Sequence, residues 1–148
     1  MKLVKIKILN KQTFPDGRKE KIKHEGKGKY NLKNDKHYLV YNENNKGLED
    51  VETILKFNEE KNRVLMQRSK PRKTRQVFDV NESCLFEYAI GRHKMKFLTE
   101  TKSLKIETSK NKGIIKIKYN LLQNQEIFAE NSLKVEYSFI DEECSKNG

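Results

Sequence analysis

The sequence has few of the features that mark secreted, metal-dependent or membrane-spanning proteins. It contains two cysteines, Cys84 and Cys144, which are too few and too far apart for a disulfide framework or a cysteine-based metal site. No stretch approaches the roughly 20 apolar residues of a membrane helix, and the alternating N-terminal residues do not form a signal peptide. We therefore expect a cytoplasmic protein with two free thiols and no membrane partner.

Groups for catalysis and cofactor binding are equally sparse. The three histidines, His24, His37 and His93, have no metal-ligand spacing, and the glycines form no phosphate-binding loop before a helix. The carboxylates at residues 59–60 and 141–143 lie in a predicted turn and a predicted tail, where solvation accounts for them. The sequence predicts no catalytic residue, no metal and no cofactor, and it favours a binding protein over an enzyme.

Positive charge is what the chain has in excess. Lysine and arginine number 32 against 21 aspartates and glutamates, which gives a formal net charge of +11 over 148 residues. Most lysines occupy the polar positions of alternating runs, so their first effect is to solvate the surface. The chain is long enough for one domain with its own core. We expect a single domain over residues 1–140 and a polar tail over residues 141–148.

Apolar and polar residues alternate along most of the chain, as in strands with one buried face. Residues 4–8 alternate apolar side chains with lysine, and Pro15-Asp16-Gly17 then supplies a hairpin turn. A second run over residues 19–30 places Gly26 and Gly28 on its apolar side. Glycine there indicates a bend or the close approach of another backbone.

Similar runs follow at intervals of about 8–12 residues, separated by turn signals. They cover residues 37–41, 51–57, 63–69, 74–80, 84–90, 95–100, 103–109, 113–122 and 133–140. Residues 48–55 also fit a short helix, although we prefer a strand from Val51. The predicted fold class is all-β, a closed or nearly closed antiparallel up-and-down barrel of about 8–10 strands, because closure removes exposed edges. A two-sheet sandwich is the alternative that periodicity leaves open.

Several short motifs resemble the YwiB-like family of bacterial proteins of unknown function. They lie at residues 38–41 (Tyr-Leu-Val-Tyr), 53–56 (Thr-Ile-Leu-Lys), 64–68, 75–78, 88–91, 97–101 and 113–121. The resemblance runs in order from Leu3 to Phe139 and implies a lipocalin-like, calycin-type β-barrel. It favours the barrel over the sandwich and implies no activity, because the family has none assigned.

Five residues are candidates for a ligand site at the barrel mouth and lumen. Arg68 and Arg75 appear on the apolar sides of their predicted strands, where a buried guanidinium requires a partner such as a ligand carboxylate or phosphate. Tyr88, Phe97 and Tyr119 are predicted to form the walls. The predicted function is the binding of a small anionic or amphipathic ligand. An internal salt bridge or a solvated position at the rim would also explain the arginines.

A basic turn around Pro71 suggests a second function. Lys70, Arg72 and Lys73 lie there between two predicted strands. Arginine and lysine both contact phosphate, so the turn is a candidate for binding RNA or an acidic partner protein. A solvated hairpin tip accounts for the same residues, and the sequence leaves the oligomeric state open.

Overall fold

The computed structural model describes residues 1–45, 48–69, 73–90 and 92–140, apart from the side chains of residues 43–50 and 88–90. Ten β-strands account for most of these residues. They are β1 (Lys2–Thr13), β2 (Lys19–Lys33), β3 (Lys36–Asn45), β4 (Leu48–Asn58), β5 (Arg63–Arg68), β6 (Thr74–Asp79), β7 (Cys84–Ile90), β8 (His93–Thr108), β9 (Lys112–Gln123) and β10 (Glu126–Phe139). The tail predicted over residues 141–148 lies outside the described residues.

One antiparallel sheet joins all the strands, in the order β6-β5-β4-β3-β2-β1-β10-β9-β8-β7. Apart from β6 and β7, strands that follow each other in the chain are paired. β1 also pairs with β10, from Val4 with Phe139 to Thr13 with Glu130, and this ladder brings the two ends of the sequence together. The hydrogen-bonded order ends at β6 and β7, which contact each other. The predicted all-β, nearly closed barrel is confirmed.

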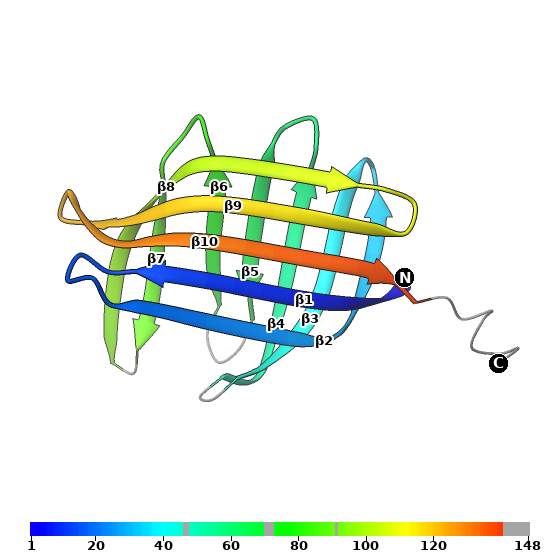
Figure 1. Ribbon diagram of the computed structural model, residues 1–148, viewed down its shortest axis with the longest axis horizontal. Helices are drawn as coiled ribbons and strands as arrows, with labels where there is room; N and C mark the ends of the chain where they lie inside the picture. Colours follow the sequence, from blue (N-terminus) through cyan, green and yellow to red (C-terminus); the bar gives the residue numbers. More distant parts are fainter. Residues whose placement is uncertain (46–47, 70–72, 91, 141–148) are drawn as a thin grey trace, which may run out of the picture.

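The strands form two layers that cross each other (Figure 1). β1, β2, β9 and β10 run across the front in this view, and β3, β4, β5 and β6 run behind them. β2 and β8 belong to both layers. The first part of β2 pairs with β1 and its last residues pair with β3, while β8 pairs first with β7 and then with β9. These two long strands are therefore the corners of the barrel.

Gly28 makes the corner in β2 possible. A Cβ atom at this position would lie 2.6 Å from the carbonyl oxygen of Val40 and 2.4 Å from Cδ1 of Ile6. A side chain is excluded chiefly by the backbone atom, which cannot rotate away. The predicted close approach is thus confirmed at Gly28. Gly26, on the same side of the strand, has more room, with His24 Nε2 at 3.4 Å from such a Cβ.

The corner in β8 corrects a prediction. A turn was expected after Thr101, but β8 continues there as a single strand, with a register shift between Thr101 and Ser103. Such a β-bulge bends a strand without ending its ladder, because only the extra residue is left unpaired. The helix alternative over residues 48–55 is also wrong, since β4 is a strand throughout. β10 begins at Glu126, earlier than the predicted residue 133.

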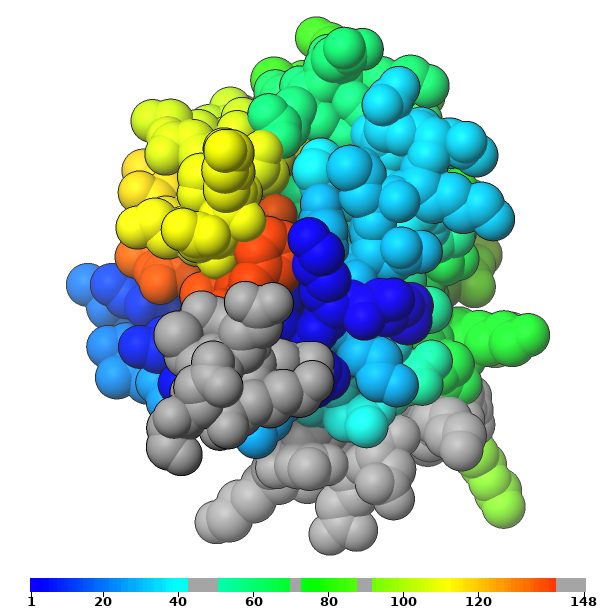
Figure 2. All heavy atoms as spheres, turned by 90° about the vertical axis from the view of Figure 1, so that its right-hand side faces the viewer, coloured from blue at the N-terminus to red at the C-terminus, as the bar shows by residue number. Residues whose placement is uncertain are grey.

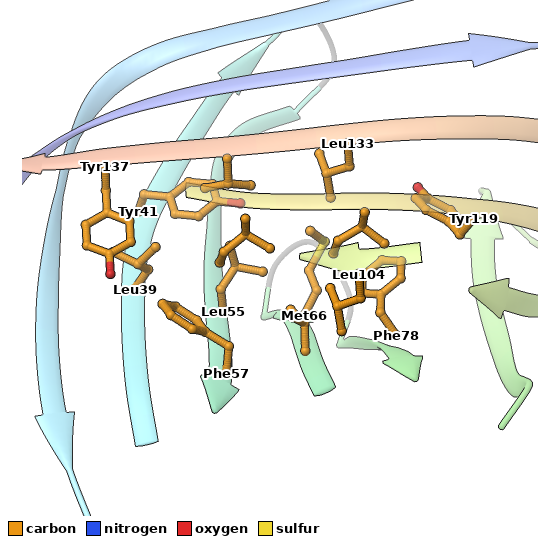
Figure 3. Packing of buried hydrophobic residues seen from close by; sticks show 14 of the residues in the cluster. Leu39, Tyr41, Leu55, Phe57, Met66, Phe78, Leu104, Tyr119, Leu133 and Tyr137 are labelled. Carbon is orange, nitrogen blue, oxygen red and sulfur yellow. The ribbon is translucent and has the colours of Figure 1, made fainter. Parts of the chain in front are cut away.

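The hydrophobic core lies between the two layers (Figure 3). Its side chains come from strands of both layers and include Leu39, Tyr41, Leu55, Phe57, Met66, Phe78, Leu104, Tyr119, Leu133 and Tyr137. Burying one large apolar side chain contributes about 1.5–3 kcal/mol. The core therefore supplies the attraction that holds the crossed layers together.

Side chains also close the seam where β6 meets the β7–β8 side of the barrel. Gln76 Nε2 of β6 donates a hydrogen bond to Thr99 Oγ1 of β8 at 3.1 Å, and both residues are buried. Phe78 of β6 packs edge-on against Tyr119 of β9, with ring centroids 4.8 Å apart. Contacts between side chains therefore join the sheet edges at this place.

Figure 2 looks onto the barrel end that holds the start of β1, the β2–β3 turn and the β8–β9 turn. An aromatic and polar cluster lies at this end of the barrel. The Tyr30 hydroxyl and His37 Nδ1 share a hydrogen bond of 2.6 Å, and the His37 ring stacks on Phe57 with centroids 4.7 Å apart. His37 Nε2 lies 3.6 Å from Glu59 Oε1, which accepts a hydrogen bond from the Thr108 hydroxyl. The cluster ties four strands, β2, β3, β4 and β8, to the β4–β5 turn.

Burial sets the protonation of this cluster. It lowers the pKa of His37 below the ordinary value of 6.5, while the Glu59 carboxylate acts in the opposite direction. Burial also raises the pKa of Tyr30, with a further contribution from Glu59. At neutral pH the hydroxyl of Tyr30 is therefore protonated and the imidazole of His37 is neutral. Because Nε2 faces the Glu59 carboxylate and carries the proton there, Nδ1 accepts the hydrogen bond from the Tyr30 hydroxyl.

Replacement of Gly28 by alanine should destabilise the barrel. The added methyl group meets the Val40 carbonyl, so backbone must shift, at a cost of about 1–3 kcal/mol in the free energy of unfolding. Gly26→Ala is the matched control on the same side of the same strand and should change stability by less than about 0.5 kcal/mol. Urea denaturation measures both. Equal destabilisation by the two variants would contradict the proposed role of Gly28.

Acidification should weaken the folded state through His37. Its pKa is lowered by folding, so the unfolded chain binds more protons below about pH 6.5, and the free energy of unfolding falls as the pH decreases through that value. His37→Gln, which cannot titrate, should flatten this fall between about pH 7.5 and 5.5 in denaturant titrations. The exposed His93 provides the control, since His93→Gln should keep the wild-type slope. A wild-type slope in His37→Gln would disprove the assignment.

Candidate functional site

A cavity of about 480 Å³ opens at the barrel end opposite the Tyr30–His37 cluster. Its volume falls within the range of about 300–1,000 Å³ that is usual for small-molecule sites. The apolar and aromatic lining consists of Ile8, Ile22, Tyr41, Met66, Phe86, Met95, Phe97, Tyr119, Leu121, Phe128 and Leu133. Asn10, Gln12, Glu20, His24, Arg68 and Gln76 add polar groups. The lining combines a large apolar wall with a small number of hydrogen-bonding groups.

Strand register explains the polar side of the cavity. Asn10 and Gln12 continue the inward positions of β1, and they pair with Ile22 and Glu20 of β2. Both β2 residues are exposed, with Ile22 at 44% of its full accessibility. This part of the wall therefore forms the mouth, where inward-facing side chains still reach water.

Arg68 supplies a permanent positive charge to the cavity. It lies at the end of β5, where it pairs with Thr53 of β4 and Thr74 of β6, and it is half-buried. Burial raises the pKa of the neighbouring Tyr119 to about 12, while the charge of Arg68 and a contact from Asn10 act in the opposite direction. The Tyr119 hydroxyl therefore stays protonated at neutral pH. The cavity thus holds a guanidinium and a neutral phenol near each other.

Three residues predicted for the ligand site line this same cavity, namely Arg68, Phe97 and Tyr119. They come from β5, β8 and β9 and are far apart in sequence. Their role in binding stays a prediction. The side chain of Tyr88 lies outside the described residues.

The expectation that Arg75 faces the interior is wrong. Gln76 pairs with Met66 on the inner side of the β5–β6 ladder, whereas Arg75 pairs with Gln67 on the outer side. Arg75 is exposed and borders a separate outer pocket of about 280 Å³. The prediction was wrong because it took the apolar Val77 to mark the inner side of β6. Val77 lies on the outer side with Arg75, although it is buried there.

The described residues include only part of the basic turn. Lys70 and Arg72 lie outside the described residues, and Lys73 is exposed next to the start of β6. The prediction that these residues bind RNA or an acidic protein therefore stays untested.

Sequence reasoning missed the wall that β1 and β2 contribute. His24 lines the cavity and stacks on Tyr41 with ring centroids 6.2 Å apart. The signal was present, because His24 and Glu20 occupy the same side of β2 as Ile22, which the alternation already assigned to the interior. Polar residues on an inward side near a strand end are typical of a cavity mouth.

A second pocket of about 440 Å³ adjoins the Tyr30–His37 cluster at the other end of the barrel. Tyr30, His37, Tyr137 and Phe139 line it. Tyr30 and His37 already bond to each other, and Tyr137 stacks on Tyr30 with centroids 5.5 Å apart. These groups are engaged in packing, so this pocket is a weaker candidate for ligand binding.

In the described part of the chain, no three histidine, cysteine or carboxylate side chains gather in a way that could hold a metal ion. Cys84 is a free, half-buried thiol, and burial raises its pKa. Within the same residues, no helix has the length and apolar character needed to cross a membrane.

Known proteins are similar to this chain in both sequence and fold. Residues 6–135 match the family model described as a domain of unknown function (DUF1934). The uncharacterised β-barrel protein YwiB of Bacillus subtilis (strain 168) is 34% identical over 106 residues, which cover 72% of each chain. The crystal structure of the YwiB protein from Bacillus subtilis matches with a TM-score of 0.81 and 26% identity, over 95% of this chain and 93% of that chain. The resemblance seen in the sequence motifs is confirmed, and the chain belongs to the DUF1934 family of β-barrel proteins.

Proposed function

We propose that the protein binds a small amphipathic molecule that carries an anionic group. The observation behind this proposal is the cavity of about 480 Å³, which joins an apolar wall to the guanidinium of Arg68. A packed barrel would leave no such space. A barrel of this size class has room for its own side chains or for one small ligand.

The apolar part of the ligand would lie against aromatic side chains. Phe86 and Phe97 are buried, Phe128 is partly exposed, and the rings of Phe97 and Phe128 are 5.0 Å apart. Removing apolar surface from water contributes about 25 cal/mol per Å². A ligand body without polar groups is therefore favoured along this wall.

The anionic part would lie beside Arg68. A guanidinium binds a carboxylate or phosphate through two parallel hydrogen bonds, and Tyr119 and Gln76 offer neutral donors in the same cavity. Glu20 is exposed at the mouth, where its negative charge disfavours an anion. Both effects orient the ligand with its charged group inward.

The charge requirement can be tested with two fluorescent probes. Anilinonaphthalene sulfonate is anionic and amphipathic, and N-phenylnaphthylamine is its neutral counterpart. Arg68→Met keeps an unbranched apolar stem but removes the guanidinium and its charge, so the dissociation constant of the sulfonate should rise about tenfold or more, as expected for loss of a hydrogen bond to a charged group. The neutral probe should bind Arg68→Met as well as it binds the wild type.

Arg75→Met is the matched control, because it makes the same chemical change on the outer face. It should leave the affinity of both probes unchanged. Equal loss in the two variants, or no enhancement of either probe in the wild type, would contradict ligand capture in the cavity. Native mass spectrometry of the purified protein then shows whether it retains a small molecule of its own.

A further inference from the structure

Lysines on the outer face of β8, β9, β10, β1 and β2 form two rows that cross the strands. This face is turned toward the viewer in Figure 1. In the first row, Lys21 pairs with Lys11, Lys11 with Ser132, and Ser132 with Lys118. In the second row, Lys23 pairs with Leu9, and the pairing continues through Lys134 and Lys116 to Lys105. Cross-strand partners point to the same side of a sheet, so these lysines share one face, which we call the basic stripe.

Rows that contain carboxylates border the basic stripe on both sides. On one side Lys7 pairs with Glu25 and Glu136. On the other side Glu130 and Glu100 both pair with Asn120. Negative charge is therefore present next to the stripe but not within its two rows. The separation produces a band of positive potential instead of an evenly mixed surface.

Carboxylates neutralise only part of the stripe. Lys134 forms an ion pair with Glu136 of the same strand, with Nζ 2.7 Å from Oε1. Lys105 forms one with Glu107, with Nζ 3.0 Å from Oε1. Among the described residues, the remaining lysines of the stripe form no ion pair; they are Lys11, Lys21, Lys23, Lys116 and Lys118.

Like charges crowd at one end of the stripe. The neighbouring charge of Lys23, followed by partial burial and the charge of Lys11, lowers the pKa of Lys21. The three ammonium groups come from the β1–β2 hairpin, where Lys21 pairs directly with Lys11. Their mutual repulsion would be relieved by a bound anion.

We propose that the basic stripe binds the phosphodiester backbone of a nucleic acid strand without reading its base sequence. Adjacent strands lie about 4.8 Å apart, so a stripe across five strands extends over roughly 20 Å. A linear array of cations complements a linear array of phosphates, and the released counterions supply the free energy of binding. This surface lies outside the barrel and is independent of the cavity ligand.

The same rows lack the groups that other modes of binding require. Leu9 is the one large apolar residue in the two described rows, and it is half-buried. No exposed aromatic side chain of the two rows is available to stack on a base. For the same reason the two rows offer nothing to insert into a lipid bilayer. Contact with phosphate alone predicts binding that is weak, independent of sequence and strongly dependent on salt.

The test uses fluorescence anisotropy with a labelled, unstructured oligouridylate. Lys11→Gln, Lys21→Gln and Lys118→Gln are combined in one variant, which removes one row of the stripe. The matched control combines Lys33→Gln, Lys36→Gln and Lys61→Gln, exposed lysines at the β2–β3 and β4–β5 turns, and it loses the same net charge. We expect the wild type to bind with a dissociation constant of roughly 1–100 μM at physiological salt.

The stripe variant should weaken binding at least tenfold at about 50 mM salt, and its slope of log affinity against log salt should fall by about 2, since each contact with a single strand contributes about 0.7. The control should stay within about threefold of the wild type. Circular dichroism checks that both variants are folded. Equal effects of the two variants, no binding at low salt, or binding to phosphatidylserine vesicles but not to the oligonucleotide would each overturn the proposal.

Discussion

Alternation of side chains between the inside and the outside of a nearly closed sheet is the constraint on which the other features of this protein depend. In β1, residues 8, 10 and 12 face the cavity, while Leu9 and Lys11 belong to the basic stripe. In β2, Ile22 and His24 line the cavity, while Lys21 and Lys23 lie outside. A shift of register by one residue would exchange the two sets. The ladder that fixes the register therefore fixes both surfaces together.

The alternation that carries this constraint is local, which is why much of the fold could be predicted from the sequence. Period-two runs gave the strands and the all-β class, and Gly28 marked a close backbone approach that a side chain would block. Arg68 was placed correctly on the inner side because its strand has one apolar face. Prediction was wrong at Arg75 because Val77 and Phe78 of β6 are both buried, so apolar character no longer distinguishes the two faces.

Features that depend on strands distant in sequence could not be read in the same way. Lys23 and Lys134 share a row because Leu9 pairs with both. Until that pairing is known, the lysines look scattered along the chain. The bend at Thr101 likewise resembles a turn, since a bulge and a turn have similar local sequences. The cavity walls from β1 and β2 join those from β8 and β10 only once the ladder between β1 and β10 has formed.

The break between β6 and β7 has a consequence for how the chain folds. β1 to β6 form one run of successive hairpins and β7 to β10 form another, so most pairings within each run connect residues close in sequence. The two runs are joined by hydrogen bonds through β1 and β10, whose partners lie near opposite ends of the chain. Loop-closure entropy makes such a distant pairing slow compared with hairpin formation. The meeting of the first and last strands is thus expected to set the folding rate, and the seam at β6 and β7 closes through side chains once that step has occurred.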